Sequence, residues 1–263
     1  MLISDAQAEQ FARDGFLILR EFADPLRCDA IRDAALVHMK YKIAPVETEE
    51  EYEQKDKAAR ETVDGTVVDP LDHSVTLRRL RQMYDRDILF RQWMEEPTIR
   101  PILARLLGET PVLTLAHHNS IMTKMPHRST QTHWHQDRRY WHFDNDNLLS
   151  VWLAVQEENE HNGVLEFIPG SHRMHFGAEC FDERDYFRDD HAPNRALIAR
   201  KTSFTLHRGD VVLFHCRLLH RANANRTDTP KIAPVYTVKG IGNRAIEGTR
   251  SARFPEVVLP LAE

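Results

Sequence analysis

The hexapeptide Thr132–Asp137, which reads Thr-His-Trp-His-Gln-Asp, constrains this chain more than any other feature. Within it, His135 and Asp137 are two residues apart, and on a β-strand two such side chains project from the same face. An imidazole and a carboxylate side by side are two thirds of the 2-His-1-carboxylate arrangement that binds non-haem Fe(II) and leaves coordination positions open for substrates. The chain must therefore fold so that a histidine distant in sequence reaches these two ligands.

His220, which follows the apolar segment 210–215, is the predicted third ligand, and His215 is its rival. The His-x-Asp tripeptide 135–137 by itself is weak evidence for a metal site, because 15 histidines make chance matches common. Two solvated or hydrogen-bonded side chains would give the same pattern. A cupin-like zinc or manganese site that pairs His133 with His135 is a further alternative, although a carboxylate with a remote histidine fits iron better.

Composition restricts the class of protein. A length of 263 residues allows a large core, and β-barrels of this size are commonly single domains. A net charge of −5 argues against nucleic-acid binding, which needs a basic stripe. We expect no membrane span and no signal peptide, because no apolar segment approaches 18 residues and the N-terminus lacks a basic and an apolar region. Three cysteines, Cys28, Cys180 and Cys216, are too few for a disulfide framework and indicate reduced thiols in a cytoplasmic protein.

Helical patterns dominate residues 1–108. Ser4 and Asp5 predict the start of a helix that runs to about Arg13, and Asp24-Pro25 predicts a second that runs to about Tyr41. The remaining predicted elements here are a buried strand over 16–19 and a helical pair over 85–94 and 97–107. Residues 43–75 are acidic and poor in apolar groups, so we expect a solvated excursion, with a lid over a substrate as the alternative.

The pattern changes after Gly108. Short apolar segments alternate with turn residues, which predicts a β core over 109–263, either a sandwich or a barrel. The predicted strands cover 112–124, 132–137, 148–155, 164–168, 203–206, 210–215 and 231–238. Residues 176–199 lack a strand pattern and are interpreted as an insertion. Without any linker between the two parts, we expect one domain over 1–263.

Several motifs occur in a fixed order along the chain. They are Asp14-Gly15-Phe16-Leu17, Lys124-Met125-Pro126, Thr132–Asp137, Tyr140-Trp141, Asn162–His172, Gly209–His215, His220 and Asn225. In order and spacing this set resembles the phytanoyl-CoA dioxygenase family of Fe(II)/2-oxoglutarate oxygenases. The resemblance covers most of the chain and implies a double-stranded β-helix (a cupin-like jelly roll) preceded by helices.

The resemblance also implies an activity. Iron is expected on His135, Asp137 and His220, with 2-oxoglutarate and O₂ as co-substrates. The family oxidises a small molecule while 2-oxoglutarate is converted to succinate and CO₂, and the retained carboxylate of Asp137 favours hydroxylation over halogenation. A metal-binding cupin-like module without turnover, or a metalloenzyme that is not an oxygenase, is the alternative.

Co-substrate contacts follow from the same resemblance. The family places an arginine eleven residues after the distal histidine, where it binds the far carboxylate of 2-oxoglutarate, and this chain has Lys231 there. Lysine is a point charge without the bidentate fork, so Arg226 is a second candidate. His118, Thr132 and Trp141 are the other residues predicted to border the co-substrate.

Basic residues are predicted near the mouth of the pocket: Arg138, Arg139, His142 and Arg173. They suit a polar or anionic substrate, although a solvated charged rim would have the same composition.

Overall fold

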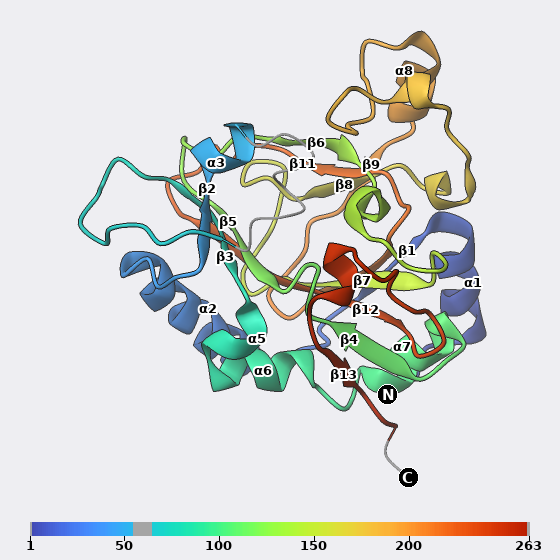
Figure 1. Cartoon of the computed structure of the whole chain (residues 1–263), viewed down its shortest axis with the longest axis horizontal. Helices are drawn as coiled ribbons and strands as arrows, with labels where there is room; N and C mark the ends of the chain where they lie inside the picture. Colours follow the sequence, from blue (N-terminus) through green and yellow to red (C-terminus); the bar gives the residue numbers. More distant parts are fainter. Residues whose placement is uncertain (1, 55–64, 262–263) are drawn as a thin grey trace.

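Two antiparallel β-sheets form the centre of the molecule, and helices cover one face of the larger sheet (Figure 1). The computed structural model describes residues 2–54 and 65–261. The larger sheet has the order β1 (Phe16–Leu19), β10 (Val211–His215), β7 (Leu148–Leu153), β12 (Lys231–Gly240), β5 (Ser120–Lys124), β3 (Leu77–Arg81) and β2 (Val46–Thr48), with β4 (Pro111–Thr114) paired to β12 and β13 (Glu256–Val258) paired to β4. The smaller sheet has the order β6 (Thr132–His135), β11 (His220–Ala222), β8 (Leu165–Phe167) and β9 (Thr202–Ser203).

The first two helices begin where the sequence provides capping groups. Ser4 and Gln7 form a reciprocal capping box at the first helix, and Gly15 ends it in the left-handed region, at φ 85°. The Asp24 carboxylate caps the second helix. The helices are α1 (Asp5–Asp14), α2 (Pro25–Lys40), α3 (Glu49–Gln54), α5 (Met83–Arg86), α6 (Ile88–Met94), α7 (Arg100–Leu107) and α8 (Ala192–Ile198), and the short 3₁₀ turns are η1 (Asp137–Tyr140), η2 (Ser171–Arg173), η3 (Ala178–Cys180) and η4 (Arg250–Ala252). None of the described helices is long and apolar enough to cross a membrane.

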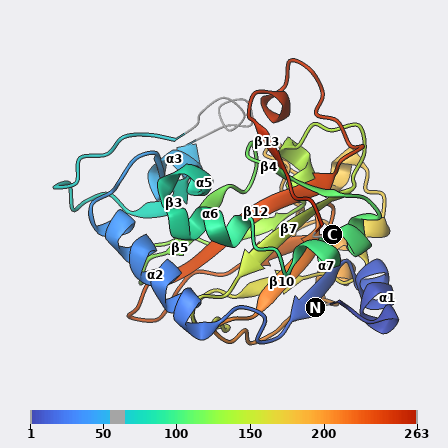
Figure 2. The same ribbon diagram turned by 90° about the horizontal axis from the view of Figure 1, so that it is seen from below.

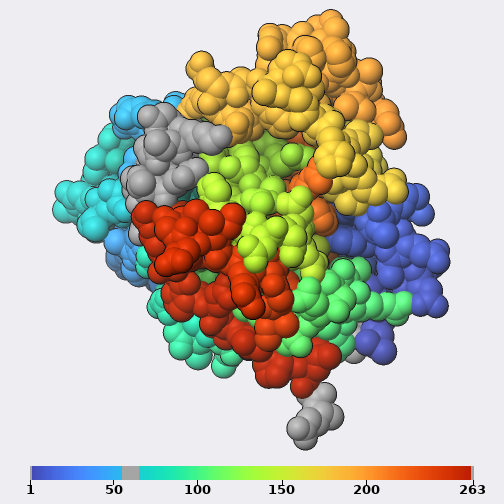
Figure 3. Space-filling view, turned by 45° about the vertical axis from the view of Figure 1, so that its right-hand side comes forward, coloured from blue at the N-terminus to red at the C-terminus, as the bar shows by residue number. Residues whose placement is uncertain are grey.

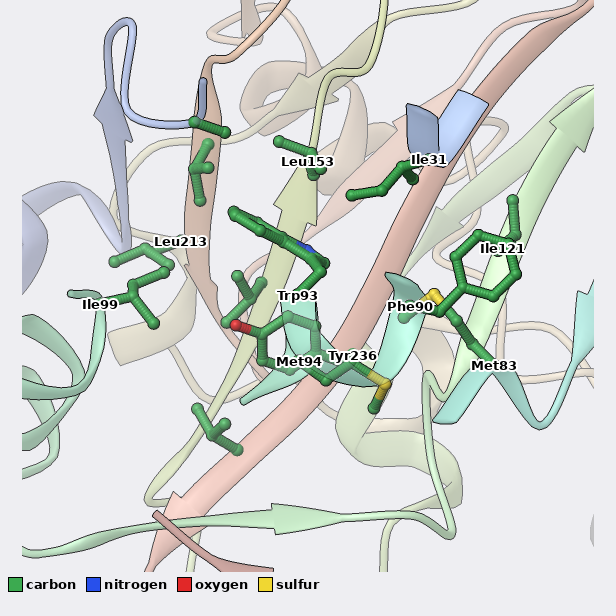
Figure 4. Close-up of a cluster of buried hydrophobic side chains, with 14 of the residues drawn as sticks. Ile31, Met83, Phe90, Trp93, Met94, Ile99, Ile121, Leu153, Leu213 and Tyr236 are labelled. Atoms are coloured by element: carbon green, nitrogen blue, oxygen red, sulfur yellow. The ribbon is translucent and has the colours of Figure 1, made fainter. Parts of the chain in front are cut away.

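The strands of the larger sheet divide their side chains between two cores. On β10, Val211 and Leu213 join the cluster beneath the helices, whereas Val212 and Phe214 join the cluster between the sheets. This alternation follows from the two-residue period of a strand. Figure 2 shows α2 and α6 lying over the sheet, and Figure 4 shows Trp93 of α6 beside Tyr236 of β12, with Phe90 of α6 near Met83. Two facing sheets with an inner core agree with the expected double-stranded β-helix.

Part of the N-terminal region differs from the expected solvated excursion. Glu47 and Glu49 are 1% and 6% exposed, so the interpretation as solvated is wrong for these two residues, whereas Glu50 is exposed as expected. The reason is β3, a strand that sequence patterns missed, whose Arg78, Arg79 and Arg81 form ion pairs with the two glutamates. Much of the predicted excursion, residues 55–64, lies outside the described residues, and the lid stays a prediction.

Several predicted strands also have different boundaries, and the predicted strand 203–206 is only the short β9. The segment 112–124 is two strands, β4 and β5, separated by a turn in which His118 adopts the left-handed region at φ 44°. The segment 132–137 ends as a strand at His135, and Asp137 begins η1. The segment 176–199 projects from the body of the molecule in Figure 1, and its Phe187 belongs to a buried cluster with Trp134 of β6.

Candidate metal centre and co-substrate pocket

The smaller sheet brings the three predicted metal ligands together. β6 and β11 are adjacent and antiparallel, and His220 lies directly opposite His135. Asp137 follows in η1, so that its Oδ1 atom is 3.7 Å from the Nε2 atoms of both histidines. The three ligand atoms lie within 4.8 Å of one another, and all three residues are buried.

Backbone carbonyls select the tautomer of both histidines. The Nδ1 atom of His135 is 2.8 Å from the carbonyl oxygen of His133, and that of His220 is 2.9 Å from the carbonyl oxygen of Leu218. Each Nδ1–H therefore donates to a carbonyl, and the Nε2 lone pair faces Asp137. Burial lowers the pKa of both imidazoles, which keeps them in the neutral form that binds metals.

The carboxylate of Asp137 is held from two sides. The Ser150 hydroxyl donates to its Oδ2 at 3.0 Å, and the His118 Nε2 atom is 3.2 Å from its Oδ1. Burial alone would raise the pKa of Asp137, but the facing His118 and His220 outweigh it and hold this pKa well below its usual value. Two neutral imidazoles and an ionised carboxylate form a donor set that fits Fe(II).

One pocket contains the ligand triad and most of the residues predicted to bind the co-substrate. Trp141 is buried and forms a wall, with its ring edge-to-face against His118 at 5.1 Å. The hydroxyl of Thr132 accepts a hydrogen bond of 2.8 Å from Arg78, and both residues border the same pocket. Lys231 also borders this pocket, but its ammonium is 2.9 Å from a carboxylate oxygen of Glu158.

Some predicted positions lie away from the pocket. Arg226 is exposed and does not border it, because the turn that carries Arg226 is tied to β5 by the Asn225 side chain, which donates to the Lys124 carbonyl at 2.8 Å. The structure therefore does not bring Arg226 to the pocket, where the resemblance would have it bind the co-substrate. His215 is not in the group of possible metal ligands found among the described residues, and its Nδ1 accepts a hydrogen bond from the Arg217 backbone at 3.1 Å.

Of the four basic residues predicted at the mouth, Arg139 borders the pocket. Arg138 instead forms an ion pair with Asp146, and neither His142 nor Arg173 is among the lining residues. In Figure 3 the light-green segment around η1 lies between the orange segment 176–199 and the red segment around η4. Arg139 and Arg250 come from two of these neighbouring segments and border the same pocket.

Sequence reasoning missed several polar residues of the site. Ser150 lies in an apolar strand, and only the pairing of β7 with its neighbours turns its hydroxyl toward Asp137. Arg78 is buried on β3, where Leu-Arg-Arg-Leu-Arg lacks the strict alternation of a strand signal, so the sequence pattern did not reveal it. Lys124 stands in the Lys-Met-Pro motif, although the motif alone does not assign it a role.

A comparison with protein families gives a match of residues 11–233 to the model described as "Phytanoyl-CoA dioxygenase (PhyH)". The chain belongs to the phytanoyl-CoA dioxygenase family. Together with the buried triad, this membership identifies the chain as an Fe(II)/2-oxoglutarate-dependent dioxygenase, and it disfavours a metal-binding module without turnover.

Individual relatives are distant. An ectoine dioxygenase of Sphingopyxis alaskensis is 24% identical over 263 residues, which cover 92% of this chain and 78% of that protein. The crystal structure of EctD from S. alaskensis with bound Fe has a TM-score of 0.72 and 20% identity, covering 99% of this chain and 87% of that chain. The 2-oxoglutarate-dependent carbocyclase SnoK from nogalamycin biosynthesis has a TM-score of 0.69 and 18% identity, covering 97% of both chains. These likenesses support the double-stranded β-helix.

Proposed function

We propose that this enzyme hydroxylates a small anionic organic molecule that enters beside Arg139. When bound, iron and 2-oxoglutarate supply the oxidation by O₂, in which a substrate C–H becomes C–OH and 2-oxoglutarate becomes succinate and CO₂. The protein's own contribution is to hold the metal on His135, Asp137 and His220, to orient the substrate, and to exclude water.

Arg139 carries the assignment of an anionic substrate. Its guanidinium lies between the rings of Tyr140 and Tyr186, 4.5 Å from each ring centroid, and donates to the Asp185 carbonyl at 3.1 Å. Within the described parts of the chain, no carboxylate lies within ion-pair distance of it. A planar cation fixed by two rings and without a carboxylate partner suits a carboxylate or phosphate group of a ligand.

Tyr186 connects this position to the metal site. Its ring lies 6.5 Å from that of His135 and 5.2 Å from that of His133. Its hydroxyl is 2.5 Å from that of Tyr52 in α3. The segments 176–199 and 49–54 therefore meet beside the triad, which is where a substrate would be enclosed.

The experiment is a substrate screen read by succinate release, with Fe(II), ascorbate and 2-oxoglutarate present. The screen uses matched pairs, each a carboxylate or phosphate compound and its neutral amide or alcohol. We expect succinate release to be stimulated by anionic members. The Arg139→Met variant should raise KM for an active anionic compound by about tenfold or more, the scale of a lost charge-assisted hydrogen bond.

The matched control is Arg188→Met, which removes a surface guanidinium paired with Asp190 and should leave KM unchanged. Equal stimulation by neutral members, or an unchanged KM in Arg139→Met, would contradict the anionic substrate. Absence of any succinate, even slow uncoupled formation with Fe(II) and 2-oxoglutarate, would contradict the dioxygenase reaction itself.

A further inference from the structure

Two buried lysines lie side by side on the inner face of the larger sheet. Lys124 of β5 is directly opposite Lys231 of β12 in the antiparallel register. Lys124 is 8% exposed and Lys231 is 1% exposed, and both border the pocket that contains the metal ligands. Two adjacent ammonium groups in a buried site repel each other unless anions compensate them.

Lys231 is already compensated by the protein. Its ammonium is 2.9 Å from a carboxylate oxygen of Glu158 and 2.7 Å from the Gly163 carbonyl oxygen, and it lies 5.0 Å above the ring of Trp152. The other oxygen of Glu158 accepts a hydrogen bond of 3.0 Å from the Trp152 indole. Glu158 is completely buried, and its charge and that of Lys231 compensate each other inside the core without a ligand.

Lys124 has no equivalent carboxylate. Its ammonium donates to the Thr130 carbonyl at 2.9 Å, and no acidic side chain of the described chain lies within ion-pair distance of it. The nearby Glu49 is itself paired with Arg78 at 2.7 Å. Burial, followed by the charges of Arg78 and Lys231, lowers the pKa of Lys124 well below its usual value.

An ammonium group has three donors, and the Thr130 carbonyl takes one. Protonating a buried amine with unused donors is costly, which is why its pKa is lowered, and an anion that enters the pocket offsets that cost. Of the two adjacent lysines, Lys231 already has a carboxylate partner and Lys124 has none, so an anionic ligand would stabilise the ammonium form of Lys124.

We propose that Lys124 binds the far carboxylate of 2-oxoglutarate, and that Lys231, which sequence position favours for this role, instead holds Glu158 beside it. This inference rests on the dioxygenase function, because it assigns a residue to the co-substrate of that reaction.

Binding measurements test it without turnover. The protein is loaded with Mn(II) under anaerobic conditions and titrated calorimetrically with 2-oxoglutarate and with 2-oxovalerate, which has the same 2-oxo acid and chain length but no far carboxylate. Wild-type protein should prefer 2-oxoglutarate. Lys124→Met should weaken 2-oxoglutarate binding by about 10- to 100-fold and leave 2-oxovalerate nearly unchanged, because only the far carboxylate loses its partner. Lys124→Arg should retain the preference.

The matched control is Lys231→Met combined with Glu158→Gln, which removes the neighbouring ion pair without leaving a buried charge. We expect this double variant to retain the preference for 2-oxoglutarate. If it loses the preference while Lys124→Met keeps it, Lys231 is the anchor and the inference is overturned. If Lys124→Met does not bind Mn(II), the double variant alone decides the question. Loss of its preference for 2-oxoglutarate over 2-oxovalerate overturns the inference, and retention of that preference supports it. Wild-type protein that does not bind 2-oxoglutarate at all would instead contradict the dioxygenase function.

Discussion

His220 lies directly opposite His135 across two antiparallel strands, and the centroids of the two imidazole rings are 4.2 Å apart. The metal site therefore depends on the register of the smaller sheet. A slip of one residue would turn His220 to the other face of the strand and remove it from the site. The carbonyls of His133 and Leu218, which set the two tautomers, belong to the same segments and would move with them.

Removing any ligand of the triad should abolish metal binding. We expect His135→Ala, Asp137→Ala and His220→Ala each to lose Fe(II) and turnover and to keep the fold, because the cores beneath the helices and between the sheets are untouched. Anaerobic Fe(II) titration with circular dichroism of the same samples measures both properties. A variant that retained full iron-dependent activity would remove its residue from the site.

Ser150→Ala should weaken metal binding although Ser150 is not a ligand. Its hydroxyl is the donor to the Oδ2 atom of Asp137 at 3.0 Å, and loss of such a partner of a metal ligand typically costs about 10- to 100-fold in affinity. Competitive titration of Co(II) against a chelator gives the affinity. Unchanged Co(II) affinity would show that His118 alone orients the carboxylate.

Lys231→Met should destabilise the fold by about 3–5 kcal/mol, because it leaves the fully buried carboxylate of Glu158 without its cation. Adding Glu158→Gln should recover much of this loss, since the amide oxygen can still accept from the Trp152 indole. Urea unfolding of both variants measures the difference. Equal stability of the single and double variants would mean that the ion pair contributes little.

Acidification should destabilise the protein partly through His215. Burial, and then the neighbouring His172, lowers the pKa of His215 to about 4, whereas an unfolded histidine titrates near about 6.5. Between these two pKa values His215 is protonated in the unfolded chain and neutral in the folded chain. The free energy of unfolding therefore falls as the pH drops from about 6.5 toward 4.

The variant His215→Asn isolates this contribution, because the asparagine oxygen can still accept the hydrogen bond that the Arg217 backbone donates to Nδ1. Between pH 7 and pH 5, wild-type protein should lose about 2 kcal/mol more unfolding free energy than the variant. Urea unfolding at the two pH values checks this, and identical losses would assign the acid sensitivity to other groups. The variant should keep Fe(II) binding, and loss of metal would give His215 the role of a ligand.

The sequence by itself determined the elements with local signals. Ser4, Asp24 and Gly15 are capping or terminating residues whose effect requires only their neighbours in the chain, so α1 and α2 were predicted close to their observed bounds. The candidate metal ligands were also accessible to sequence reasoning, because iron requires particular residue types and the set of motifs restricts which histidine can join the His-x-Asp pair.

Tertiary structure alone decided how the charges of the site are paired. A buried lysine looks the same in sequence whether or not a carboxylate reaches it, and the pairing of Lys231 with Glu158 arises from strand register and a loop far away in the chain. The same is true of Glu47 and Glu49, whose composition predicts solvation until β3 places arginines against them. Electrostatic compensation depends on distances of a few ångströms between segments remote in sequence, and these distances exist only in the folded chain.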